Sequence, residues 1–288
     1  MADVPSNPFL DDDDATDRSL ADRAVEGDRE ALRALVVRHQ PFVFNLALRM
    51  FGRHDDAEDL TQEVLVKVIT SLRTFRHDSQ LRTWLYRITV NHFLKTRRRA
   101  MELSIDDFAT YFDGVASTED AEPSAGPEVV EELRLRCTTG MLMCLDRDQR
   151  LTFILGAVFG ASHTVAADIL AITPSNFRVR LHRARRDLYS WMNARCGLVN
   201  TANACRCARK TAAYVRRGLV DPQRLVFNAD YVVRVDALTR RGAAGAMATI
   251  DDLHERVFGS HPLAVSRSVV VDEILGNEQL RAFFALDT

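Results

Sequence analysis

Three of the chain's five cysteines lie in one short stretch, CGLVNTANACRCARK, as Cys196, Cys205 and Cys207. Three thiolates can hold a zinc ion when a side chain or a water molecule supplies the fourth ligand. The C-x8-C-x-C spacing differs from the usual pair of C-x2-C knuckles, so it does not select metal binding by itself. The candidate fourth ligands are His163, His182, His254 and His261. Metal binding, thiol oxidation and inert packing therefore all remain open.

Positive charge surrounds these three cysteines. A neighbouring cation lowers the pKa of a thiol and favours the thiolate, which is the form that binds metals and reacts with oxidants. The basic neighbours are Arg206, Arg209 and Lys210. We therefore expect thiolate character in this stretch. Cys137 and Cys144 share a helical face with apolar residues, which is typical of small core residues.

A second candidate site lies in residues 160–191, where arginines are crowded. We expect a short helix over residues 164–170 and a second helix after it. Thr173 is a suitable N-cap for the second helix, and Pro174 suits its first position. This pattern predicts a helix-turn-helix, in which the second helix enters the major groove of DNA. A helical hairpin with an arginine-rich outer face is the alternative.

The outward face of that second helix carries side chains suited to DNA. Residues in its first half would contact base edges, and the arginines further along would contact phosphates. Apolar Val179 is a candidate partner for a thymine methyl group. The candidate DNA contacts are Ser175, Asn176, Arg178, Val179, His182, Arg183 and Arg186.

The net charge of −2 conceals strong segregation of charge along the chain. Residues 82–99 are basic and contain no acid, whereas residues 102–132 are acidic and contain no Lys or Arg. A second basic cluster follows at residues 178–186. Two basic blocks with an acidic spacer indicate two contacts with a polyanion. Each block taken alone is also compatible with a solvated helix face.

Composition and patterning set the class of protein. A hydrophobic fraction of 47% and a charged fraction of 27% are typical of folded, soluble proteins. The chain has no apolar run of about 20 residues and no secretory pattern at its N-terminus, so we expect a cytoplasmic protein without membrane insertion. An odd number of cysteines argues against a disulfide framework.

Helical periodicity dominates the first hundred residues. Apolar residues recur every three or four positions over residues 57–72. Asp28 is a candidate N-cap for a helix over residues 29–51, and Ser79 is a candidate N-cap for a helix over residues 80–99. The chain shows no convincing strand alternation, so we expect an all-α fold.

Two segments together resemble one family. DAEDLTQEVLVKVITSLRTFRHDSQLRTWLYRITVN, residues 56–91, resembles region two of the extracytoplasmic-function sigma factors of bacterial RNA polymerase. LDRDQRLTFILGAVFG, continuing through RLHRARRDL, resembles region four of the same family. The resemblance covers residues 17–192 and implies two helical sigma domains. Their expected bounds are 17–100 and 128–192, with an acidic N-terminus at 1–16, an acidic flexible linker at 101–127 and a Cys-containing, regulatory helical extension at 193–288.

The resemblance implies a role for each segment. The chain would bind RNA polymerase core, at the clamp helices of the largest subunit and at the flap, and direct promoter-specific initiation without catalytic residues or a required cofactor. The implied core-binding residues are Asp55, Asp59, Gln62, Glu63 and Lys67. The implied minus-ten residues are Arg76, His77, Asp78, Ser79, Arg82, Arg87, Asn91 and Lys95. The second helix of the helix-turn-helix would read the minus-thirty-five element.

The chain departs from the family in the turn of the helix-turn-helix, where Ala171 replaces the usual Gly. Regulation would come from an anti-sigma factor or from the C-terminal extension, with zinc or another metal at the three cysteines as one possibility. A stand-alone helix-turn-helix regulator that binds duplex DNA without polymerase is the alternative function. An enzyme with a thiol nucleophile is the third class, and no Cys/His motif supports it.

Overall fold

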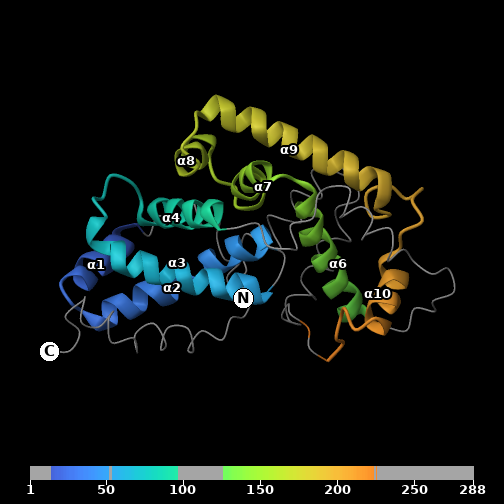
Figure 1. Cartoon of the computed structure of the whole chain (residues 1–288), viewed down its shortest axis with the longest axis horizontal. Coiled ribbons are helices and arrows are strands. Elements are labelled where there is room, and N and C mark those ends of the chain that lie inside the picture. The colour runs from blue at the N-terminus through green and yellow to red at the C-terminus, as the bar shows by residue number, and fades with distance from the viewer. Residues whose placement is uncertain (1–13, 52–53, 97–125, 224, 226–288) are drawn as a thin grey trace.

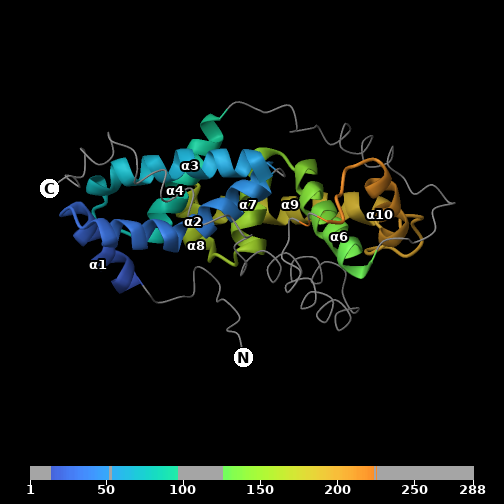
Figure 2. The same cartoon turned by 90° about the horizontal axis from the view of Figure 1, so that it is seen from below.

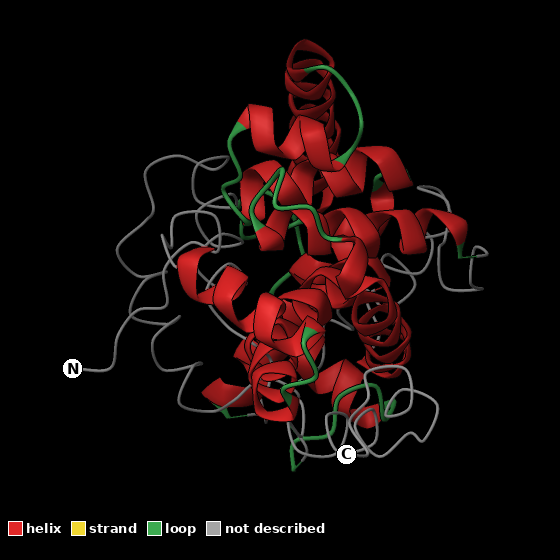
Figure 3. Cartoon of the chain, turned by 90° about the vertical axis from the view of Figure 1, so that its left-hand side faces the viewer, coloured by secondary structure: helices red, strands yellow, loops and turns green. Residues whose placement is uncertain are grey.

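A computed structural model describes residues 14–51, 54–96, 126–223 and 225 of the chain. All regular structure in these ranges is helical, which confirms the predicted all-α fold (Figure 3). No helix in the same ranges is both long and apolar enough to cross a membrane. Most of the acidic N-terminus and of the linker, the tail after residue 225, and His254 and His261 lie outside the described residues.

The described part of the N-terminal unit has four α-helices and a 3-10 turn (Leu72–Thr74) (Figure 1). The α-helices are α1 (Asp14–Val25), α2 (Arg29–Phe51), α3 (His54–Ser71) and α4 (Leu81–Lys95). Asp28 caps α2, because its Oδ1 accepts a hydrogen bond from the Ala31 N–H at 3.0 Å. The predicted bounds and cap of this helix are confirmed. The apolar stripe of α3, including Leu60 and Val64, is buried against α2.

The start of α4 differs from the prediction. The helix begins at Leu81, and the Leu81 N–H donates to Asp14 Oδ1 of α1 at 3.2 Å. Ser79 does not cap it, since its hydroxyl donates to the Gln80 carbonyl at 3.3 Å. A carboxylate from another helix supplies the acceptor at this N-terminus, which the dipole of α4 favours.

The second unit is also helical. Its elements are α6 (Pro127–Met141), a 3-10 turn (Leu142–Cys144), α7 (Arg147–Phe153), a π-helical segment (Ile154–Val158), α8 (His163–Ile169), α9 (Pro174–Arg195) and α10 (Cys207–Arg216). α9 runs above α7 and α8 in Figure 1, and α6 and α10 pack side by side at the end of the molecule opposite α1 (Figure 2). Gly156 allows the π-helical segment to approach α9, because a Cβ there would lie 2.9 Å from Leu181 Cδ2.

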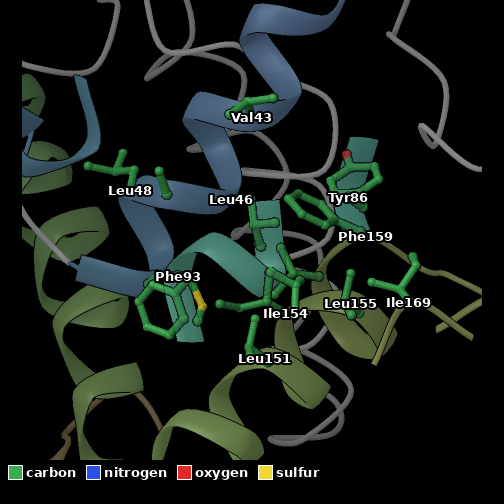
Figure 4. Close-up of a cluster of buried hydrophobic side chains, with 14 of the residues drawn as sticks. Val43, Leu46, Leu48, Tyr86, Phe93, Leu151, Ile154, Leu155, Phe159 and Ile169 are labelled. Atoms are coloured by element: carbon green, nitrogen blue, oxygen red, sulfur yellow. The ribbon is translucent and has the colours of Figure 1, made fainter. Parts of the chain in front are cut away.

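The two units share one apolar core. Figure 4 shows Tyr86 and Phe93 of α4 beside side chains from the α7–α8 segment. The rings of Tyr86 and Phe159 lie 5.8 Å apart between centroids, and both residues are buried. The Arg49 guanidinium of α2 lies over the same Phe159 ring at 5.1 Å. Separating the units would therefore expose apolar surface.

A buried arginine joins the two units through the backbone. The Arg150 guanidinium of α7 donates to the carbonyls of Leu142 at 3.0 Å, Leu145 at 2.9 Å and Met50 at 2.6 Å. Met50 lies in the last turn of α2, where a carbonyl lacks a partner within its own helix. Arg147 adds a second link, because it donates to the Thr96 carbonyl at 2.8 Å. These contacts hold α7 against the end of the N-terminal unit.

Candidate nucleic-acid interface

The helix-turn-helix is formed by α8, a short turn and α9. Thr173 caps α9, because its Oγ1 accepts a hydrogen bond from the Asn176 N–H at 3.2 Å, and Pro174 is the first helical residue. Both predictions are confirmed. Ala171, in the turn, has a φ of 53°, which is the left-handed region that favours glycine. The turn therefore holds an alanine in a backbone conformation that is strained for it.

Ala171→Gly should raise the free energy of unfolding by about 1 kcal/mol, because the alanine Cβ is unfavourable at positive φ. Denaturant unfolding measures the change. Ala194→Gly is the matched control, since Ala194 has an ordinary position in α9 and glycine should destabilise there by about 0.5–1 kcal/mol. Equal destabilisation by both substitutions would contradict the strain at Ala171.

The outer face of α9 presents all seven residues predicted to contact the minus-thirty-five element. Each of them is exposed, and 47% of Val179 is accessible. The opposite face, with Phe177 and Leu181, is buried against the rest of the second unit. The seven candidate DNA contacts are therefore exposed, as the helical periodicity of this segment predicts. Arg186 also pairs with Asp187 Oδ1 at 2.9 Å, so it would exchange that partner for a phosphate.

The loop before α4 carries the predicted minus-ten residues. Arg76 and Asp78 are exposed, and Ser79 and His77 are half-buried. His77 has a φ of 62°, and its Nε2 lies 3.1 Å from Asp22 Oδ1 of α1. Asn91 and Lys95, on α4 itself, are exposed.

Trp84, beside this loop, packs 5.5 Å from Phe75 between ring centroids and contacts the core. This contact gives Trp84 a structural role.

Arg82 is a correction to the predicted minus-ten set. Its side chain is 7% exposed, lies over the Phe42 ring at 5.0 Å, and approaches Asp17 Oδ2 at 3.7 Å. Asp17 is itself buried and lies 2.6 Å from Arg38. Burial alone would raise the pKa of Asp17, but the His39 hydrogen bond and the nearby positive charges outweigh it and lower that pKa. Arg82 therefore stabilises a buried carboxylate and is not available to DNA in this conformation.

Arg87 has a partner that sequence reasoning missed. Its Nη2 lies 2.5 Å from Asp168 Oδ2, on the first helix of the helix-turn-helix. The two side chains are 37% and 54% exposed, so the pair lies at the surface of the boundary between the units. The residues are 81 positions apart, and no local pattern signals the contact.

The predicted core-binding residues lie on α3. Asp59, Glu63 and Lys67 are exposed, Gln62 is half-buried, and the side chain of Asp55 lies outside the described residues. Glu63 Oε2 lies 2.6 Å from His92 Nε2 of α4. Most of this set is therefore on the surface, as docking on a partner protein requires.

Cys196, Cys205 and Cys207 lie near α10, away from the helix-turn-helix turn and from α3. Burial raises the pKa of the Cys207 thiol to about 11 and also raises the pKa of Cys196. The expectation of thiolates is therefore wrong for these two residues, because burial outweighs the neighbouring cations. The Arg206 guanidinium donates to backbone carbonyls, including those of Thr201 and Cys205.

As their side chains lie, no three His, Cys, Asp or Glu residues in the described ranges are arranged to hold a metal ion. His163 packs 5.8 Å from the Phe177 ring, and His182 lies on the exposed face of α9. Neither of these two candidate fourth ligands is grouped with the thiols.

Comparison with known proteins gives two family matches. Residues 35–102 match "Sigma-70 region 2", and residues 135–188 match "Sigma-70, region 4". The chain is 31% identical over 175 residues to the ECF RNA polymerase sigma-E factor of Escherichia coli strain K12, covering 59% of this chain and 91% of the relative. It is 28% identical over 174 residues to the RNA polymerase sigma-H factor of Pseudomonas aeruginosa, covering 59% and 90%. A solved structure of CnrH in complex with the cytosolic domain of CnrY is 27% identical, covers 62% of this chain and 98% of that chain, and has a TM-score of 0.46.

Proposed function

Because the chain belongs to the extracytoplasmic-function sigma factors of bacterial RNA polymerase, we propose that the described structure is its closed resting form and that it reads promoters in an open form. As a sigma factor, the chain binds RNA polymerase core and directs promoter-specific initiation. A stand-alone regulator would not account for the region 2 match. Its action needs no catalytic residue of its own and takes place in the cytoplasm, with polymerase.

The spacing of promoter elements supports two forms. The minus-ten and minus-thirty-five elements are about 25 base pairs apart, which is about 85 Å along B-DNA. In the described structure α4 packs against α8, and only a short turn separates α8 from α9. The two DNA-reading helices are therefore too close together to contact both elements. Residues 97–125, about 30 in number, could span at most about 100 Å if the units separated.

The observation that carries the proposal is the contact between Arg87 and Asp168. The Asp168 carboxylate presents an oxygen to the Arg87 guanidinium at 2.5 Å, as a DNA phosphate would. DNA and α8 therefore compete for the same cation. Binding of core and promoter must also offset the exposure of Tyr86 and Phe159 when the units separate.

Asp168→Asn should shift the chain toward the open form. An exposed ion pair contributes about 0.2–1 kcal/mol, so the ratio of open to closed chains should rise at most about fivefold. Energy transfer between dyes at exposed Thr70 of α3 and Ser190 of α9 measures that ratio.

Asp148→Asn is the matched control. Asp148 is an exposed carboxylate that pairs with Arg180 at 3.4 Å within the second unit, so its loss changes the net charge equally without touching the boundary. An unchanged distance distribution in Asp168→Asn, or an equal shift in both variants, would contradict the proposal that the Arg87–Asp168 pair stabilises a closed form. Run-off transcription by the parent chain with core polymerase tests the sigma function separately.

A further inference from the structure

Helix α1 contacts both the minus-ten loop, residues 76–79, and the start of α4 that follows this loop. Asp14 Oδ1 accepts the hydrogen bond of the Leu81 N–H at 3.2 Å. Asp22 Oδ1 lies 3.1 Å from Nε2 of His77. The two aspartates are about two turns apart on α1, so one short helix holds the loop at one point and the first turn of α4 at another.

A buried carboxylate fixes α1 in this place. Asp17 is 1% exposed and lies between the other two aspartates along the helix. Its carboxylate oxygens lie 2.6 Å from Arg38 and 3.2 Å from His39, both of α2, and 3.7 Å from Arg82 of α4. A buried carboxylate without such partners is costly, so α1 cannot shift along α2 and α4 without a large loss. The aspartates on either side are therefore held at fixed positions beside the loop.

The loop needs this support because its backbone is strained. His77 has a φ of 62°, in the left-handed region that is unfavourable for a residue with a Cβ. Its ring packs on Phe75 at 4.6 Å between centroids, and Phe75 packs on Trp84 of α4 at 5.5 Å. These ring contacts and the contact with Asp22 offset the strain. They also fix the direction of the exposed side chains on either side of His77.

The charge of Asp22 acts against DNA binding. Its side chain is 62% exposed, and a carboxylate there repels the phosphates of DNA that approaches the loop. Its contact with His77 acts in the opposite sense, because it holds the loop in one conformation before DNA arrives. The two effects of this residue on DNA affinity therefore differ in sign, and a substitution can separate them.

We propose that α1 positions the minus-ten loop, with Asp14 and Asp22 as positioning residues that act through the Leu81 N–H and through His77. Neither aspartate contacts DNA in this role. The match to region 2 begins at residue 35, after the end of α1, so it does not assign the role. The inference rests on the proposed reading of promoters by the open form, which brings the loop to the minus-ten element.

Asp14→Ala should weaken binding of the holoenzyme to a promoter fork, which is single-stranded across the minus-ten element, by about 2–30-fold, the range for loss of an N-cap acceptor. The reason is that the first turn of α4 must then become ordered as the strand binds. Asp28→Ala is the matched control, because Asp28 accepts the Ala31 N–H at 3.0 Å and caps α2 instead of α4. It removes an equal charge and a similar cap, and we expect fork binding within about twofold of the parent.

Asp22 provides a second test through the sign of the effect. Asp22→Ala should weaken fork binding by up to about fivefold, because the loop loses an exposed polar contact. Removal of the charge alone would strengthen binding instead. Asp22→Asn lacks the charge but keeps an oxygen that can accept a hydrogen bond from His77. It should therefore bind the fork at least as tightly as the parent.

All variants are measured as full-length chains with core polymerase. Circular dichroism, binding to core and binding to duplex DNA that carries only the minus-thirty-five element should be unchanged. Fork binding that is unchanged in folded Asp14→Ala, or weakened equally by Asp28→Ala, would overturn the role of α1, as would tighter fork binding by Asp22→Ala. Failure of the parent holoenzyme to bind the fork would contradict the reading of the minus-ten element itself, and the role of α1 with it.

Discussion

Arg150→Met should lower the free energy of unfolding by about 3–5 kcal/mol, because three backbone carbonyls lose a buried donor. Arg150 is 2% exposed and donates to three carbonyls from two helical units. Methionine fills a similar volume but leaves those carbonyls without this donor, and each unsatisfied buried group costs about 1–3 kcal/mol. Urea unfolding followed by circular dichroism measures the loss.

Two further variants distinguish loss of the three Arg150 hydrogen bonds from loss of its positive charge alone. Arg150→Lys should recover only part of the stability, because one ammonium cannot reproduce the planar, multiply donating guanidinium. Arg186→Met removes an exposed arginine that pairs with Asp187, and it should change stability by no more than about 0.5 kcal/mol. A loss below about 1 kcal/mol in Arg150→Met would show that the three hydrogen bonds do not hold the units together.

Arg183→Ala should weaken binding of the holoenzyme to duplex promoter DNA by about 5–150-fold, corresponding to the 1–3 kcal/mol of a base-contacting arginine. Arg183 is exposed on the outer face of α9, so its removal should leave the fold and the affinity for core unchanged. Competition binding with labelled promoter DNA measures the first affinity, and competition for core with another sigma factor measures the second.

Arg209→Ala is the matched control for Arg183→Ala. Arg209 is exposed on α10, away from the helix-turn-helix, and its loss changes the net charge equally. We expect promoter binding within about twofold of the parent, since an arginine outside the interface contributes only to the long-range field. Equal weakening of core and promoter binding by Arg183→Ala would count against the assignment of α9 to the minus-thirty-five element.

Local signals predicted those parts of the fold whose partners are close in sequence. The Asp28 cap of α2 and the Thr173 cap of α9 each bond an N–H three residues later, so the residue types alone indicate them. The apolar stripe of α3 follows from helical periodicity in the same way. The outward position of Arg183 and Val179 also needs only the geometry of a single helix.

Long-range contacts account for what the sequence did not predict. Asp14 caps α4 from 67 residues away. Arg82 is buried beside Asp17 of α1 and over the Phe42 ring of α2, so it is not part of the candidate DNA surface. The cations near Cys207 were visible in the sequence, but the burial that raises its pKa depends on the packing of α6 against α10. Residues close in sequence therefore indicate which charges surround a site, but its solvent exposure depends on contacts between distant helices.

The hydrogen bond from Arg150 to the Met50 carbonyl spans 100 residues, and this separation matters during synthesis on the ribosome. At about 5–20 residues per second, the end of α2 waits roughly 5–20 s for its donor to be made. Once α4 is made, Tyr86 packs on Phe42 of α2, but its contact with Phe159 must wait until roughly 70 more residues are added. Until Phe159 is made, part of the apolar surface of the nascent N-terminal unit stays exposed, and the rate of translation between Tyr86 and Phe159 sets for how long.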